Sequence, residues 1–285
     1  MAEEQLSPEV GRRLRRVFDE ALPAWDERTR TRPDVQPGSS LDGDLKAYPH
    51  LAAIATQGTT SAVHHLKAVR DLWMTAGTVH TFAAATLLRA ALLAAAIAVF
   101  LLDDSPGVTR RERIKRAALA ALTDHRDHLW HQTAMAEMTA TLGEDATAAH
   151  QDLIANLRHR VAEAEHVGRE HGATKKEIGK GLVDTACIVR AGRVLSRHQP
   201  PAEQVRLEAG LRAVWQKGSA DAHARTWQTT PRRNPDGGPL LRADIPEVMT
   251  GLNAATLVLN EAWRLWELRT VNYLARQLPI PPDDA

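Results

Sequence analysis

The most distinctive group of side chains repeats at intervals of four residues, with the members Trp215, Ser219, His223 and Trp227. Side chains at this spacing lie on one face of an α-helix. In the functional interpretation, Ser219 and His223 are catalytic, with the histidine as general base, and the two tryptophans contact a ligand. In the structural interpretation, the tryptophans belong to the core. We favour the structural interpretation, because no acid on this face could orient the histidine as a hydrolytic triad requires.

A second group combines carboxylates and imidazoles on one helical face, with the members Asp124, Asp127, His128 and His131. Such ligands suit zinc, manganese or iron, so a metal-dependent helical-bundle enzyme is one hypothesis, with a transition metal as cofactor. One straight helix cannot surround an ion, so a second helix would have to contribute, with Glu208, His64 and His65 as candidates. A solvated polar face is the preferred interpretation, and the sequence requires no cofactor.

Arg89 stands alone as a charge in the apolar stretch from Thr81 to Leu102. An unpaired buried charge is costly, so the sequence predicts a carboxylate partner on another helix, with Asp184, Glu208 and Glu261 as candidates. The alternative is that Arg89 binds the anionic group of a ligand in a pocket among the helices. The uncharged run 90–102 is shorter than the roughly 20 residues that cross a bilayer. We therefore predict a buried central helix and no membrane association.

A cluster of cations opens a later predicted helix, with the members Arg110, Arg111, Arg113, Lys115 and Arg116. These side chains could contact the phosphate groups of a nucleic acid, although a run of exposed arginines is more often a solvated face. The whole chain has 36 basic and 35 acidic residues. This balance creates no overall field that would attract nucleic acid or anionic lipid.

The elements that carry these residues are all predicted to be helices. Helix start signals occur at Ser7-Pro8-Glu9, at Thr109 with Glu112, at Thr174 with Glu177, and at Asp244 with Glu247. Apolar residues at helical spacing predict helices over 8–27, 60–76, 78–103, 110–141, 146–171, 175–198, 201–227 and 247–277, with a shorter broken helix near 44–57. No segment alternates in the manner of a strand.

These helices predict an all-α fold, a single bundle of about eight or nine helices over the whole chain. Proline and glycine mark surface loops at 29–44 and 228–245, and the tail 278–285 is expected to fray. The single cysteine, Cys187, excludes an internal disulfide. The first residues lack an apolar signal core, so we expect a cytoplasmic protein.

The order of several features resembles a loose group of uncharacterised actinobacterial all-helical proteins. Arg89 leads into a Leu/Ala helix that ends in Leu101-Leu102-Asp103-Asp104, and the basic stretch 110–116 follows. Trp215-x3-Ser219-x3-His223 is close to an aromatic-Ser-His signature. The resemblance covers roughly the segment from Thr81 to Trp227 and implies an all-helical fold.

Arg126-Asp127-x3-His131 resembles the signature of the HEPN superfamily, which is an arginine, a polar residue and, after a short spacing, a histidine. HEPN domains are helical and often cleave RNA in toxins and antiviral systems. The resemblance implies a dimeric ribonuclease in which Arg126 and His131 are catalytic.

No complete catalytic set is present, so the sequence favours a non-enzymatic helical module. We expect it to bind a partner protein or a small ligand, with a homodimer as one form. The first alternative is a HEPN-like ribonuclease that acts as a toxin or defence component. The second is the metal-dependent enzyme.

Overall fold

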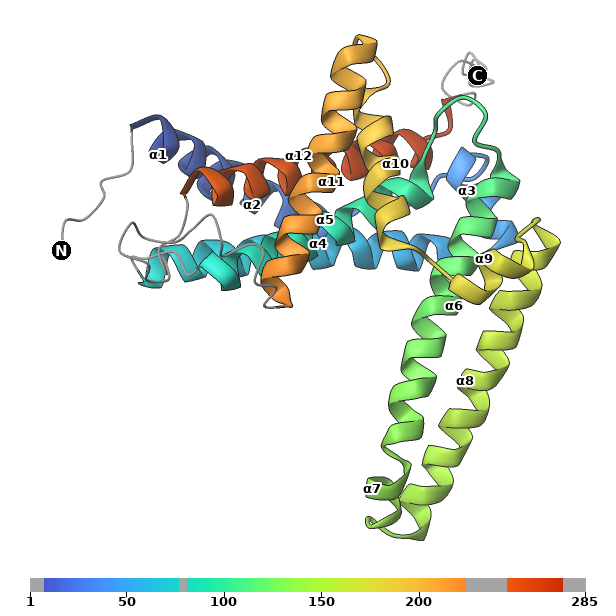
Figure 1. Cartoon of the computed structure of the whole chain (residues 1–285). Coiled ribbons are helices and arrows are strands. Elements are labelled where there is room, and N and C mark those ends of the chain that lie inside the picture. Colours follow the sequence, from blue (N-terminus) through green and yellow to red (C-terminus); the bar gives the residue numbers. More distant parts are fainter. Residues whose placement is uncertain (1–7, 77–80, 224–244, 274–285) are drawn as a thin grey trace, which may run out of the picture. The chain divides into compact units, whose positions relative to one another are not determined.

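The computed structural model describes residues 8–76, 81–223 and 245–273. Every regular element within these ranges is a helix and none is a strand, so the all-α prediction is confirmed (Figure 1). Contacts divide the chain into two compact units. The first comprises residues 1–35, 55–102 and 184–270, and the second comprises residues 36–54, 103–183 and 271–285. The organisation as one domain stays a prediction.

The first unit contains most of the apolar helices. Its elements are α1 (Pro8–Arg15), a π-helical segment η1 (Arg16–Ala21), α2 (Leu22–Arg30), most of α4 (His50–Ala76), α5 (Thr81–Leu102), α10 (Asp184–Ser196), α11 (Pro201–Ala222) and α12 (Ile245–Thr270). Helix α5 is central and packs against α10, α11 and α12. Fully buried side chains such as Leu92, Leu252 and Trp263 form the core between them.

Helix α4 passes without a break through the position where the sequence suggested a gap between 57 and 60. Gly58 is the reason, because it serves packing and not a turn. A Cβ atom placed on Gly58 would lie 2.6 Å from the carbonyl oxygen of Ala94 on α5. The glycine therefore lets the two helix backbones approach closely.

Helix α5 is the one helix in the described ranges that is long and apolar enough to cross a membrane, over Phe82–Leu102. Half of its most apolar window is buried inside the structure. Helices α10, α11 and α12 pack on α5 and bury one part of its surface. The predicted buried central helix agrees with this packing.

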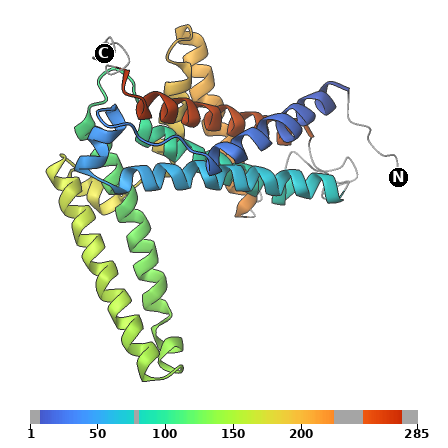
Figure 2. The same ribbon diagram turned by 180° about the vertical axis from the view of Figure 1, so that it is seen from behind.

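The second unit is built on a long antiparallel hairpin, which both ribbon views show (Figures 1 and 2). Its elements are α3 (Ser40–Ala47), α6 (Arg110–Ala134), the short α7 (Ala136–Ala140), α8 (Glu144–Glu170) and α9 (Lys175–Lys180). The two predicted N-caps within this unit are confirmed. Thr109 accepts a hydrogen bond from the backbone N–H of Glu112, and Thr174 forms a complete capping box with Glu177.

The predicted helix 175–198 is wrong as one element, because it breaks after α9. Gly181 ends α9 with a φ angle of +65°, which favours glycine. The next N–H group, that of Leu182, donates a hydrogen bond of 2.7 Å to Thr123 Oγ1 on α6. The break therefore fixes the chain against the hairpin before α10 begins.

The first predicted loop is shorter than 29–44, since it comprises only residues 31–39 between α2 and α3. Ser39 caps α3, and Leu41 and Asp44 on that helix are fully buried. The second loop at 228–245 lies outside the described residues up to its last position, and the tail 278–285 lies wholly outside them. The proposed caps Ser7 and Asp244 also lie outside.

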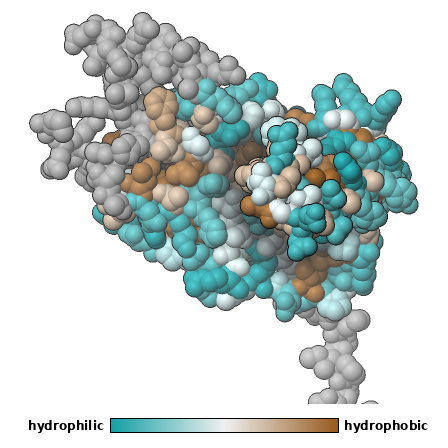
Figure 3. Space-filling view, turned by 90° about the horizontal axis from the view of Figure 1, so that it is seen from below, coloured by the Kyte–Doolittle hydropathy of each residue, from teal (hydrophilic) through white to brown (hydrophobic). Residues whose placement is uncertain are grey.

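Hydrophilic side chains predominate on the face drawn in Figure 3, and hydrophobic side chains lie in patches. The hairpin of the second unit carries several exposed apolar side chains, namely Trp130, Met138, Leu142 and Leu153. Scattered exposed apolar residues of this kind are normal on a protein surface.

Candidate functional site

A hollow of about 440 Å³ lies between α5, α11 and α12 in the first unit. Small-molecule sites in proteins commonly have this size. Most of its lining is small or apolar, with Ala85, Leu88, Ala213, Val214, Pro246 and Val248 among its members. Three charged residues complete the lining, and these are Arg89, Lys217 and Glu247. The hollow thus combines an apolar wall with a few polar groups.

Arg89 comes from α5 and lies close against α11. A Cβ atom on Gly218 would be 2.9 Å from the Cβ atom of Arg89, so the glycine makes room for the arginine. The Arg89 guanidinium carbon lies 5.5 Å from the centroid of the Trp215 ring, a cation–π distance. The Arg89 Nε and Trp215 Nε1 atoms are buried, and neither has a hydrogen-bond partner among the described residues.

The predicted ion pair of Arg89 is not found in the described parts of the chain. Glu208 instead binds Arg193 at 2.9 Å, and Glu261 binds Arg264 at 2.8 Å. Asp184 makes no ion pair with Arg89 either. Arg89 is half-buried, and its Nε has no hydrogen-bond acceptor among the described residues.

Lys217 and Glu247 form an ion pair of 2.5 Å at the hollow, joining α11 to α12. Sequence reasoning missed both residues as members of a site. The sequence marks Glu247 only as a first-turn acid, and no pattern marks Lys217. Only the packing of two helices that are distant in sequence brings these side chains together.

No described residue of the four-residue stripe on α11 lines the hollow. Trp215 contacts Arg89, as described above, but Ser219 and His223 do not line the hollow. His223 is exposed at the C-cap of α11, and its backbone N–H donates to the carbonyl of Ser219 at 3.1 Å. Trp227 lies outside the described residues. A catalytic role for Ser219 and His223 stays a prediction.

The proposed HEPN-like pair lies in the second unit. The Arg126 guanidinium donates to the carbonyl oxygen of Ile178 at 2.7 Å and pairs with Glu165 at 2.7 Å, which ties α6 to α9 and α8. His131 is exposed one and a half turns further along α6. Arg126 thus stabilises the packing of α6 against α8 and α9.

Replacing Arg126 by glutamine is expected to lower the free energy of unfolding by about 1–2 kcal/mol, because two charge-assisted hydrogen bonds are lost. The matched change His131→Ala affects an exposed side chain and is expected to cost less than about 0.5 kcal/mol. Urea denaturation followed by circular dichroism measures both values. An equal free energy of unfolding for the wild type and Arg126→Gln would show that these contacts do not stabilise the fold, and would favour a catalytic role for Arg126.

The proposed metal ligands lie on an exposed part of α6. Asp124 has 83% of its side chain exposed, and His128 interacts with Gln132 at 3.2 Å. Asp127 and His131 are also exposed. Within the described ranges, no three histidine, cysteine or acidic side chains lie close enough to hold a metal ion. The metal site therefore gains no support from the described residues.

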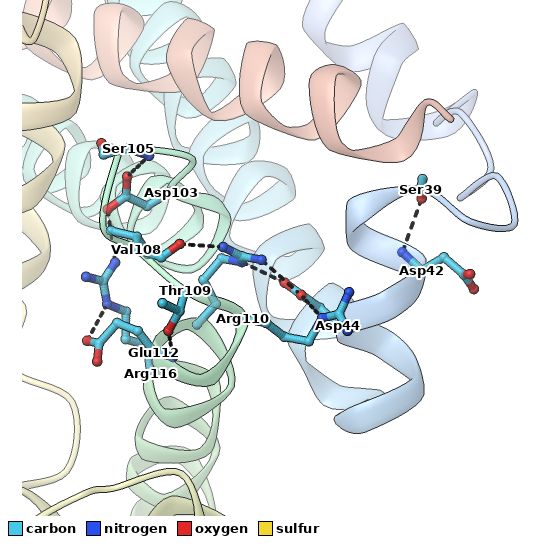
Figure 4. A network of polar contacts seen from close by, with 11 residues as sticks. Ser39, Asp42, Asp44, Asp103, Ser105, Val108, Thr109, Arg110, Glu112 and Arg116 are labelled. Carbon is cyan, nitrogen blue, oxygen red and sulfur yellow. Dashed lines mark hydrogen bonds and ion pairs between the residues drawn. The ribbon is translucent and has the colours of Figure 1, made fainter. Parts of the chain in front are cut away.

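The basic cluster at the start of α6 is engaged with acids of its own unit (Figure 4). Asp44, fully buried on α3, accepts from Arg113 Nε at 2.8 Å and from Arg110 Nε at 3.3 Å. Asp103, also fully buried, pairs with Arg116 at 3.0 Å. Lys115 binds Glu112 and Glu177, and Arg111 contacts the carbonyl of Glu170. Binding of nucleic acid by this cluster stays a prediction.

Tyr48, buried after α3, provides a pH-dependent prediction for the second unit. Its burial and the charge of Glu163 raise the pKa of Tyr48 to about 12. The ordinary pKa of tyrosine is near 10. The contribution of neutral Tyr48 to the free energy of unfolding is therefore complete below about pH 10, and it is lost as the pH rises through about 12. We expect the 295 nm absorbance difference between wild type and Tyr48→Phe to titrate near pH 12 in the folded state. A midpoint near pH 10 in the folded protein would show that Tyr48 is not buried beside Glu163.

No protein-family model, curated protein or solved structure matches this chain. Among the residues predicted to form a site, the structure brings Arg89 and Trp215 together beside a hollow. Ser219 and His223 are not among the residues that line that hollow, and the Arg126 and Asp124 groups belong to the other unit.

Proposed function

We propose that this protein is a helical binding module that holds a small amphipathic anion in the hollow between α5, α11 and α12. The observation that carries the proposal is the state of Arg89. It lines a mostly apolar hollow, no carboxylate of the described residues pairs with it, and its buried Nε has no hydrogen-bond acceptor there. A buried donor of this kind calls for an explanation, and a bound acceptor would supply one.

The charge of the hollow favours an anion. Two of the three charged residues of the lining are cations, Arg89 and Lys217, and the one acid, Glu247, pairs with Lys217. A guanidinium offers a planar fork of donors that matches a carboxylate with two parallel hydrogen bonds. Trp215 packs beside the Arg89 guanidinium but does not itself line the hollow.

The walls favour an apolar ligand body. Leu88, Val214 and Val248 line the hollow, and the remaining positions are largely alanine, glycine and proline. Each methylene group that leaves water for such a wall contributes about 0.8 kcal/mol. Binding without catalysis is the simplest role, because no histidine, cysteine or serine is part of the described lining and its one carboxylate, Glu247, faces Lys217.

Three ligands of equal chain length test the proposal by isothermal titration calorimetry on the full chain: octanoate, octan-1-ol and octylammonium. We expect octanoate to bind at least about tenfold more tightly than the alcohol, since one charged hydrogen bond contributes about 1.5–3 kcal/mol. Octylammonium should bind most weakly, because its charge repels Arg89. Equal binding of octylammonium and octanoate would contradict the proposal.

A cytoplasmic location, expected from the sequence, is part of the same proposal. Its support is the single cysteine, Cys187, which is buried and forms no disulfide. Fractionation of cells that express the tagged chain tests it, and recovery in the membrane pellet would contradict it.

A further inference from the structure

The hollow beside Arg89 continues along α11 and α12 into a second hollow of about 360 Å³. Gly210, Val214 and Thr250 line both hollows, so the two meet at these residues. The second hollow adds further apolar side chains, with Leu207, Leu211, Ala254 and Leu257 among them. Leu257 leaves 48% of its surface exposed in this groove.

Gly210, at the junction, is a glycine inside a helix that no close neighbour requires. A Cβ atom on Gly210 would meet nothing within 4 Å, whereas one on Gly218 or Gly192 would lie 2.9 Å from a neighbouring residue. Glycine inside a helix costs about 1 kcal/mol relative to alanine. No close neighbour of Gly210 requires a glycine at this position. The missing side chain leaves the passage between the two hollows wider than alanine would.

Among the described residues, the end of the second hollow that lies far from Arg89 has no unpaired charge that a charged ligand group would have to neutralise. Glu203 and Arg206, both exposed, pair with one another at 3.4 Å. Arg89 lines the other hollow, and no carboxylate of the described residues pairs with it. The positions from Leu207 to Lys217 on α11 span about 15 Å at the helical rise of roughly 1.5 Å per residue.

We infer that the ligand is an elongated carboxylate with an unbranched apolar chain, whose head binds Arg89 and whose tail passes Gly210 into the second hollow. The inference rests on the proposed function and adds the ligand class. The apolar lining of both hollows supports it, as does the position of Arg89, with which no carboxylate of the described residues pairs. A short acid would leave the second hollow and Leu257 uncovered.

The test compares hexanoate with dodecanoate, below its micellar concentration, on wild type, Gly210→Phe and Gly210→Ala by calorimetry. Helical side chains lean toward the helix N-terminus, so the phenyl ring of Gly210→Phe is directed toward Leu207 and into the second hollow. Gly210→Ala adds one methyl group in open space and serves as the matched control. Thermal unfolding of each variant verifies that it is folded.

We expect wild type and Gly210→Ala to bind dodecanoate at least tenfold more tightly than hexanoate. In Gly210→Phe, the ratio of the two affinities should fall below threefold. Equal wild-type affinity for both acids would overturn the inference and leave the proposed function standing. Retention of the dodecanoate advantage in Gly210→Phe would also overturn it. If neither acid binds wild type, the proposed function itself fails.

Discussion

Replacing Arg89 by methionine is expected to weaken octanoate binding by about 10- to 100-fold, since charged hydrogen bonds contribute about 1.5–3 kcal/mol. Methionine keeps an apolar stem of similar length against Gly218 but removes the charge. Stability should remain equal or rise slightly, because the buried Arg89 Nε has no acceptor in the described residues. A residue that binds a ligand and does not stabilise the fold should behave in this way.

Arg212→Met is the matched control, because Arg212 is exposed on α11 and does not line the hollow. It should bind octanoate as wild type does. Calorimetry gives the affinities, and thermal unfolding gives the stabilities. A large loss of stability in Arg89→Met would assign Arg89 to the core, and unchanged octanoate affinity would remove it from the site.

Replacing Asp44 by alanine is expected to lower the free energy of unfolding of the second unit by about 3–5 kcal/mol. Asp44 is fully buried and accepts hydrogen bonds from Arg113 at 2.8 and 3.1 Å. Removal of the carboxylate leaves Arg113, only 12% exposed, without this partner in a buried position. This is the largest single effect on stability that we expect.

Asp42→Ala on the same helix is the control for Asp44→Ala. Asp42 is more exposed, pairs with Lys46 at 2.8 Å and accepts from the N–H of Gly38, and its loss should cost about 1 kcal/mol. Urea denaturation followed by circular dichroism at 222 nm measures both variants. Equal effects of the two changes would show that the Asp44–Arg113 pair is no stronger than a surface ion pair.

Most of the fold could be predicted from local sequence, because helical periodicity and capping act between residues a few positions apart. Thr109 with Glu112 and Thr174 with Glu177 are examples, since each cap forms where the pattern predicts it. Gly58 and Gly181 look alike in sequence, yet one lies inside a continuous helix and the other ends a helix. The difference is set by the tertiary neighbour, which is Ala94 for Gly58 and Thr123 for Gly181.

The candidate site could be predicted only in part, for the same reason. Arg89 and Trp215 were identifiable as a charge in an apolar helix and an aromatic residue on a polar stripe. Their pairing could not be predicted, because it depends on how α5 packs on α11. The buried acid Asp44 was missed because it lies in a stretch whose prolines and glycines predicted a surface loop.

A crystal structure grown with 8-bromooctanoate tests the central claim most directly, because the anomalous signal of bromine locates the ligand independently of the protein phases. We predict that the carboxylate lies within hydrogen-bond distance of the Arg89 guanidinium. The bromine should lie in the second hollow, between α11 and α12, which Leu207 and Leu257 line. A bromine position outside that hollow, or a ligand whose carboxylate does not contact Arg89, would contradict the account.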